Sequence, residues 1–380
     1  MMYQLDFLYP IMLVFLVGIV LSFFCHKLKL PIPLVLLLAG IVIGKLAIPK
    51  EYITFPKAFV LGVAIFGLIM VTYDVFSRLK PHRHDTFSHI AAQTSFLQIG
   101  FMLLILGAVL IMTQITSDPI SIALLCTLIA GISLPIAKLR SPRLKHLVET
   151  EVTFNEVFVV FVASVLMHFL VFRTRTSLYG SVPTYITMFG LEIIIGLGAG
   201  VLLGLVVFKI FRRLSRKMTP IGILAICLAS YVLAELLDGA GVFAVLSLAV
   251  LFGAFTIKHK QELEEFSRTF SQSVEIMIFL LIGILVSIPL EKGFFLMSLL
   301  IFAMYLAIRY LVLLFVLRQH FFKPNERAVL SLIAPKGVVV AVLCLNAIFF
   351  EAELMPLLQI LVAVILYSQI TSLIAQKVER

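Results

Sequence analysis

The sequence predicts an all-α polytopic membrane protein, a chain whose helices cross a lipid bilayer many times. Of its 380 residues, 62% are hydrophobic and only 13% are charged, whereas a soluble domain carries about 45–50% apolar and about 25% charged residues. The apolar residues also come in long runs, and about 20 such residues in a helix span the hydrocarbon core. A third observation, the placement of the basic residues, gives the predicted orientation.

The apolar runs define 13 predicted spans with little chain between them, so we expect a single transmembrane domain over residues 1–380. The first run follows Asp6, with no basic residue before it and no small-residue cleavage site after it. We therefore expect a retained span and not a cleaved signal peptide. In order, the spans cover residues 10–25, 31–49, 58–77, 88–113, 118–137, 150–172, 183–210, 218–237, 240–257, 271–289, 294–317, 326–350 and 355–375.

The Lys and Arg residues are distributed unequally between alternate loops. Of the 30, 22 fall in the C-terminal tail and in every second loop from 26–30 onward, and 6 fall in the opposite loops. Because basic loops stay on the cytoplasmic side, we predict a multi-pass protein of the cell membrane with its N-terminus outside and its C-terminus in the cytoplasm. The net charge of +10 then reflects anionic lipid and does not indicate a nucleic-acid partner.

Thirteen spans whose ends face opposite sides predict two six-span units joined by one linking span. Spans 1–6 form the first unit, span 7 is the linker, and spans 8–13 form the second unit in inverted orientation. Inverted repeats of this kind are typical of secondary transporters. The predicted function class is therefore transport, and the chain is not expected to be an enzyme.

Spans 5 and 12, the fifth spans of the two units, each contain helix-breaking residues. Span 5 reads Gly131-Ile132-Ser133-Leu134-Pro135 and span 12 reads Ala334-Pro335-Lys336-Gly337. Proline removes a helix donor and glycine loosens the backbone. Interrupted spans at matching positions indicate a transport site; ordinary proline kinks in packed helices are the alternative.

Several ionisable residues lie at span depth, where they are costly and indicate function. In span 6, Glu156 is followed by a long apolar stretch, so we expect it to be the deepest acid of that span. A buried carboxylate there can exchange a proton for a cation. Alternatively, Glu156 only pairs with Lys336 or caps a broken helix.

The other polar residues of the predicted site receive structural roles. Glu151 and Asn155 share a face of span 6, and we expect Glu151 to form an ion pair with Arg309 of span 11, with Asn155 accepting a further hydrogen bond. The permanently charged guanidinium of Arg309 is unsuited to carrying protons. At the span 12 break, Lys336 is expected to neutralise a helix C-terminus, an interpretation we prefer to a proton shuttle.

The remaining candidates are weaker. Asp74 and Tyr73 end span 3 and could line an entry funnel, but we prefer to interpret Asp74 as an ordinary interfacial acid. The spacing of the cysteines indicates neither a disulfide framework nor a metal site, so we expect no cofactor and no metal beyond a transported cation. The cysteines are Cys25, Cys126, Cys227 and Cys344.

Taken in order, these residues resemble the monovalent cation/proton antiporter superfamily, in particular its sodium/proton exchanger branch, over nearly the whole chain. Residues 149–160 are similar to the family motif Glu-Gly-Glu-Ser-x-x-Asn-Asp, which places Asn155 and Glu156 on the Asn-Asp pair. Further matches are residues 231–253 with Tyr-x-Leu-Ala-Glu…Ser-Gly-x-x-Ala, residues 334–339 with Gly-Pro-Arg-Gly-Val-Val, and Arg309 with the arginine of span 11.

The resemblance implies that two broken helices cross in a mobile ion-binding core over 88–172 and 294–376. It also implies a scaffold over 1–80 and 218–290 that forms a homodimer, with 183–212 as the linker helix. A proton and a monovalent cation would compete for the span 6 acid while the core moves as an elevator.

The sequence departs from the family pattern at several site positions. The family's Thr-Asp-Pro of span 5 reads Ser133-Leu134-Pro135, so its aspartate is absent, and the Asp of Asn-Asp is Glu156. The remaining cation ligands are then Glu156, Ser133, backbone carbonyls of the break and water. The other departures are Val152 for the serine of Glu-Ser, Tyr73 for a span 3 glutamate and Lys336 for the span 12 arginine.

The leading hypothesis is an antiporter that exchanges sodium or potassium for protons, with Glu156 as the shared carrier. Two alternatives stay open. Loss of the span 5 aspartate can alter the coupling, giving a leak or transport of another solute. The fold can also serve a non-transporting membrane sensor or partner subunit, because fold alone does not determine function.

Overall fold

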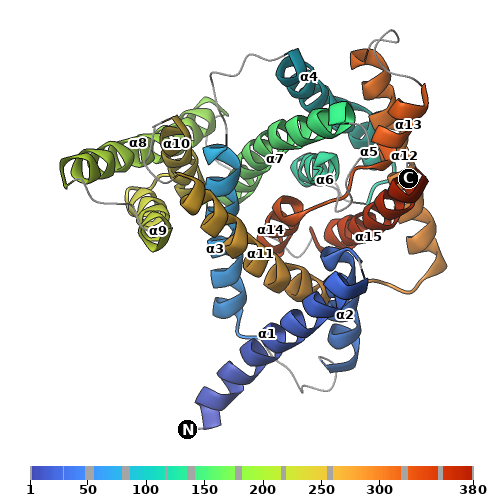
Figure 1. Ribbon diagram of the computed structural model, residues 1–380, viewed down its shortest axis with the longest axis horizontal. Helices are drawn as coiled ribbons and strands as arrows, with labels where there is room; N and C mark the ends of the chain where they lie inside the picture. The colour runs from blue at the N-terminus through green and yellow to red at the C-terminus, as the bar shows by residue number, and fades with distance from the viewer. Residues whose placement is uncertain are drawn as a thin grey trace. The chain divides into compact units, whose positions relative to one another are not determined.

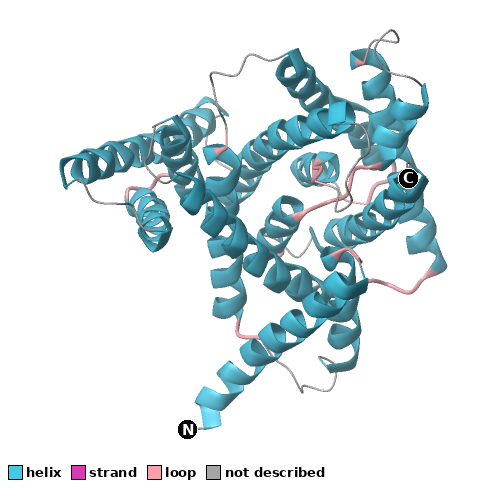
Figure 2. Cartoon of the chain, in the orientation of Figure 1, coloured by secondary structure: helices cyan, strands magenta, loops and turns pink. Residues whose placement is uncertain are grey.

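The computed structural model describes residues 2–28, 30–47, 55–78, 86–115, 118–134, 142–175, 182–214, 220–254, 260–317, 324–349 and 354–378. Within these ranges every regular element is a helix (Figures 1 and 2). This confirms the predicted all-α class.

Each predicted span has a helical counterpart, and two spans are divided. Span 4 contains a π-helical turn, η1, a distortion that often marks functional positions, and span 12 consists of two helices with an extended segment between them. The helices are α1 (Met2–Leu28), α2 (Ile32–Ala47), α3 (Lys57–Ser77), α4 (Thr86–Phe101), η1 (Met102–Leu106), α5 (Gly107–Met112), α6 (Pro119–Ala130), α7 (Pro142–Arg175), α8 (Val182–Leu214), α9 (Pro220–Leu236), α10 (Gly241–Ala254), α11 (Lys260–Leu285), α12 (Lys292–Val316), α13 (Pro324–Leu332), α14 (Val338–Ala347) and α15 (Met355–Val378).

Six helices in the described part of the chain are long and apolar enough to cross a bilayer by themselves, and the other predicted spans contain shorter apolar helices. Some of these helices are short because their spans are broken, and α6 is an example. With 12 residues, α6 is about 18 Å long, whereas the hydrocarbon core is about 30 Å thick. The extended segment after α6 therefore has to cover part of the thickness. The count of 13 spans and the inverted repeat stay predictions.

The chain forms two compact units. The first contains residues Met1–Ala64, His84–Ala163 and Val274–Arg380, and the second contains Ile65–Arg83 and Ser164–Ser273. Both broken spans and the polar part of α7 belong to the first unit, whereas α8, α9 and α10 form most of the second. The predicted scaffold, core and linker concern movement during transport and stay predictions.

In the first unit, α2 and α11 approach each other closely at Gly40 and Gly283. A Cβ atom on Gly283 would lie 2.5 Å from the carbonyl oxygen of Leu37 and 2.8 Å from the Cα of Gly40. These are backbone atoms, which cannot yield as a flexible side chain would. Close approach through small residues is a common way to pack helices in membranes, so the contact depends on the absence of a side chain at both positions.

We predict that Gly283→Ala destabilises the protein by about 1–3 kcal/mol, as overpacking typically does, despite the better helix propensity of alanine. Gly62→Ala is the matched control, because a Cβ at this position of α3 meets nothing within 4 Å. Thermal unfolding of the purified protein in detergent measures the difference. Equal melting temperatures for the two variants would contradict the proposed close contact.

Candidate functional site

The first helix break follows α6, a helix that is capped by hydrogen bonds at its start and at its end. Asp118 caps the start of α6 by accepting a hydrogen bond from the amide of Ser121 (2.9 Å). After Ala130 the backbone leaves the helix over residues 131–134, with Gly131 in an extended conformation, and the amide of Gly131 donates to the carbonyl of Leu128 (3.2 Å). Pro135, the last residue of the predicted break, lies outside the described residues.

Asn155 of α7 holds this extended segment in place. Its Oδ1 accepts a hydrogen bond from the amide of Ile132 (2.8 Å), and its Nδ2 donates to the carbonyl of Ala130 (3.3 Å). The side chain is fully buried. The expectation that Asn155 binds Arg309 is wrong: both polar atoms of its amide bind the broken backbone, which needs partners from the protein at this depth.

The second break lies between α13 and α14, and it crosses the first. The amide of Ser133 donates to the carbonyl of Pro335 (2.8 Å), which joins the two extended segments directly. A Cβ atom on Gly337 would collide with the side chain of Ser133, so glycine is needed where the segments meet. The loop between α13 and α14 is visible in Figure 2.

Helix α15 fixes the backbone of the second break. The amide of Lys336 donates to Oγ of Ser368 (3.2 Å), and Nε2 of Gln369 donates to the carbonyl of Lys336 (2.7 Å). Both side chains are buried. Two consecutive polar residues of α15 therefore bind both backbone polar groups of one residue in the break.

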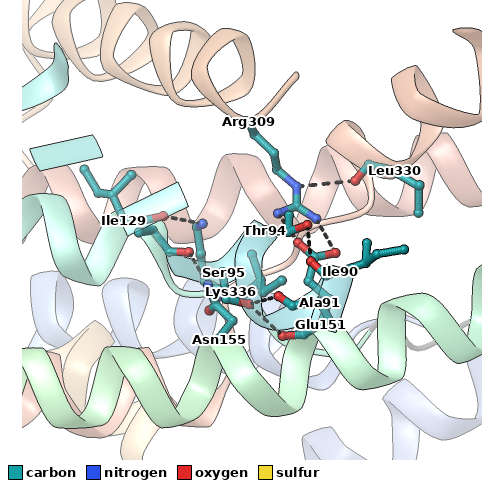
Figure 3. A network of polar contacts seen from close by, with 12 residues as sticks. Ile90, Ala91, Thr94, Ser95, Ile129, Glu151, Asn155, Arg309, Leu330 and Lys336 are labelled. Carbon is teal, nitrogen blue, oxygen red and sulfur yellow. Dashed lines mark hydrogen bonds and ion pairs between the residues drawn. The ribbon is translucent and has the colours of Figure 1, made fainter. Parts of the chain in front are cut away.

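The side chain of Lys336 reaches across to the first break. Its Nζ donates to the carbonyl of Ile129 near the C-terminus of α6 (Figure 3). The same atom lies 3.6 Å from the centroid of the Tyr305 ring, and Lys336 is fully buried. Lys336 thus occupies the helix C-terminus, where the partial negative charge of the helix dipole favours a cation.

An ion pair between Glu151 and Arg309 lies beside the crossing. Nη1 of Arg309 donates to Oε1 of Glu151 (3.0 Å), Nη2 donates to Oε2 (3.3 Å), and Nε donates to the carbonyl of Leu330 (3.3 Å) (Figure 3). Each residue is only 1% exposed. Oγ of Ser95 in α4 donates to the carbonyl of Glu151 (3.2 Å), so the network links α4, α7, α12 and α13.

Glu156 lies on α7 immediately after Asn155 and is partly exposed. Residues three and four apart share a face of a helix, which places Glu156 on the face of Val152 and Val159. Both valines are buried, and Cγ1 of Val159 lies 3.5 Å from the position of a Cβ on Gly131. This face of α7 therefore packs toward the first break.

The possible funnel residues belong to the second compact unit. Tyr73 is buried, with its ring 6.5 Å from that of Phe252, and Asp74 forms an ion pair with Arg78.

The described residues include no group of three or more His, Cys, Asp or Glu side chains that could hold a metal ion. The four cysteines are buried free thiols.

Comparison with known proteins decides the family. A family model described as "Sodium/hydrogen exchanger, transmembrane" matches residues 11–377. The chain belongs to the sodium/hydrogen exchanger family. A similar solved structure is that of the sodium proton antiporter MjNhaP1 from Methanocaldococcus jannaschii, with a TM-score of 0.73 and 16% identity over 99% of this exchanger and 97% of that chain. No curated protein matches the sequence.

Family membership confirms the resemblance derived from the motifs. This exchanger is a multi-pass integral membrane transporter of the cation/proton antiport class, and not an enzyme. Its ions are substrates and not cofactors. The structural likeness to MjNhaP1 shows a shared antiporter fold.

Sequence reasoning missed four residues of the site: Ser95, Tyr305, Ser368 and Gln369. Signals for them exist in the sequence. Tyr305 lies one helical turn before Arg309 and therefore on the same face of α12, and Ser368 and Gln369 are adjacent polar residues in a largely apolar span. Their partners were not predictable, because the rotation of one helix against another cannot be read from one chain.

We predict that Arg309→Met and Glu151→Leu are each strongly destabilising, by about 3–5 kcal/mol, because each leaves a buried charge without its partner. The double variant should lose far less stability than the two single variants together, since it removes both charges. Thermal unfolding of all four proteins gives the coupling energy. As a control, the same set of variants at Lys145 and Glu149, a half-exposed pair 3.7 Å apart, should give a coupling energy of about 0–1 kcal/mol. Equal coupling energies for the two pairs would contradict a strong buried ion pair between Glu151 and Arg309.

We predict that Gly337→Ala lowers stability by about 1–3 kcal/mol through overpacking, because the new methyl group collides with Ser133. Adding Ser133→Gly removes the obstructing side chain and should restore part of the loss. Unfolding temperatures of the single and double variants test this. Additive losses, with no rescue by Ser133→Gly, would mean that the two breaks do not meet at these residues.

Proposed function

We propose that this exchanger moves sodium or potassium across the cell membrane in exchange for protons, with Glu156 as the carboxylate that binds either ion. The observation that carries the proposal is the position of Asn155. By binding Ala130 and Ile132 it fixes α7 against the first break, and Glu156 is the next residue along the chain. A carboxylate is thereby held beside an opened helix, the feature that forms ion sites in transporters of this kind.

Among the acids of α7, Glu156 is the best suited to carry ions. Both carboxylate oxygens of Glu151 accept hydrogen bonds from Arg309, so proton binding there would break a buried ion pair. Glu149 is half-exposed and faces Lys145. Glu156 is deeper than Glu149 along the helix and lies on the face toward the break, where water can reach its partly exposed side chain.

The other oxygen ligands follow from the same geometry. We infer that Ser133 contributes its hydroxyl, because it lies at the crossing and is partly exposed. The carbonyls of Ile129 and Ala130 already accept hydrogen bonds from Lys336 and Asn155. Each keeps one lone pair at most for an ion, so water supplies the rest of the coordination shell.

One carboxylate as the shared ligand predicts one proton exchanged for one monovalent cation. Proton and cation exclude each other at Glu156, and each shifts the inward–outward equilibrium only through its differential affinity for the two states. In this proposal the core of residues 88–172 and 294–376 moves against a dimeric scaffold of residues 1–80 and 218–290. The N-terminus lies outside and the C-terminus in the cytoplasm, and Asp74 is the candidate residue for an entry funnel.

We predict that Glu156→Gln abolishes cation-dependent proton exchange, because the amide can neither release a proton nor supply a negative charge. Glu156→Asp should retain part of the activity. The purified protein is reconstituted in liposomes with an internal pH dye, and sodium, potassium or lithium is added outside. Glu149→Gln on the same helix is the matched control and should exchange ions like the unchanged protein.

The outcomes separate the candidate functions. Full exchange by Glu156→Gln would exclude Glu156 as the carrier. Proton flux in the unchanged protein that is independent of all three cations would indicate a leak, the altered coupling expected from Leu134 in place of an aspartate. No flux under any condition, from a protein shown to be folded, would favour a non-transporting role.

A further inference from the structure

The C-terminus of α6 has a specific partner for each of its last carbonyl groups. Leu128 accepts from the amide of Gly131, Ala130 accepts from Asn155, and Ile129 accepts from the amine of Lys336. Terminal carbonyls lack intrahelical partners and must find others when buried. Two of these partners are neutral, so Lys336 is the only one of the three whose side chain can carry a positive charge at the helix end.

The charge of Lys336 is not met by a carboxylate in the described part of the chain. The amine of Lys336 contacts the carbonyl of Ile129 and the ring of Tyr305, and Glu151, the buried acid of the neighbouring ion pair, is bound to Arg309. Lys336 is fully buried, and a buried ammonium group without compensation is very costly. An ammonium group at this position therefore needs stabilising contacts other than an acid.

Tyr305 provides the second half of that compensation. The ring lies under Nζ of Lys336 at 3.6 Å from its centroid, well inside the range of about 6 Å for a cation–π interaction. Phe302 stacks on Tyr305 at 5.9 Å between centroids, and Tyr367 of α15 contacts Phe302 at 5.7 Å. The ring thus packs within a group of aromatic side chains.

The hydroxyl group of Tyr305 adds an independent indication. It is buried and has no hydrogen-bond partner among the described residues. A buried hydroxyl without a partner destabilises the fold, so its hydrogen bonding does not explain the placement of this side chain. The face of the ring, and not its polar end, makes the specific contact.

We propose that the Ile129 carbonyl and the face of Tyr305 form a neutral binding site for a primary ammonium group, which this exchanger fills with its own Lys336. The site holds a tethered cation between the two broken spans without using an acid. It lets the chain keep a buried lysine although Leu134 offers no carboxylate. The inference does not depend on Glu156 being the ion carrier.

The first experiment varies the electrostatics of the ring at constant shape. Tyr305→Phe should leave the melting temperature unchanged or raise it, because it removes the unsatisfied hydroxyl. Replacing that phenylalanine by its mono-, di- and trifluorinated analogues weakens the negative face of the ring stepwise, and the melting temperature should fall in the same order. The same substitutions at Phe279, a buried ring of α11, control for the effect of fluorine on packing.

A flat response at position 305, or the same response at Phe279, would overturn the proposal. The fluorine series should also become flat in a Lys336→Met background, because no cation then lies above the ring. A persisting slope in that background would mean that fluorine acts through packing alone. Since these variants preserve the shape of the ring, they are expected to fold.

The second experiment asks whether the vacated site binds a free ammonium group. Lys336→Ala removes the part of the side chain that propylammonium can replace, and propylammonium should raise the melting temperature of this variant. Propan-1-ol, of similar size and uncharged, should not. Adding Tyr305→Leu should remove the response. Equal stabilisation by the alcohol, or a response that survives Tyr305→Leu, would contradict an ammonium site.

Discussion

The constraint on which this site depends is that a helix opened at membrane depth must have its backbone groups satisfied by the protein. Here the partners come from the other break and from side chains of α7 and α15. The amide of Ser133 binds the carbonyl of Pro335, and Asn155 binds the two backbone groups on either side of Gly131. These hydrogen bonds set where the two breaks meet.

The Glu151–Arg309 pair extends this crossing into a larger network of contacts. Asn155 and Glu151 lie one turn apart on α7, so the same helix face holds the first break and the guanidinium group. Arg309 in turn binds the carbonyl of Leu330, close to the end of α13 and the start of the second break. A movement of one break would disturb all of these contacts, which favours motion of the ion site as one piece in the proposed exchange.

The sequence predicted the parts of the site that have strong chemical signatures. Gly131, Pro335 and Gly337 predicted the two breaks. The ion pair of Glu151 and Arg309 was predicted from two charges at a depth where charges are rare. The partners of Asn155 and the roles of Tyr305, Ser368 and Gln369 were not predictable. A neutral polar residue fits many helix faces in a membrane, and only the three-dimensional arrangement decides which backbone group it binds. The π-helical turn η1 likewise has no strong signal in its apolar sequence.

The missing span 5 aspartate is best understood through the charges around the crossing. Glu151 and Arg309 neutralise each other, and the carbonyl of Ile129 and the ring of Tyr305 accommodate Lys336 without an acid. An aspartate at position 134 would add a negative charge near Lys336 and favour an ion pair across the breaks. With leucine there, the charge of the proposed ion site varies with Glu156 alone. A carboxylate that alternates between a proton and a monovalent cation has the same charge in both loaded states, so one complete exchange would move no net charge across the membrane. The substitution at 134 is therefore consistent with electroneutral exchange.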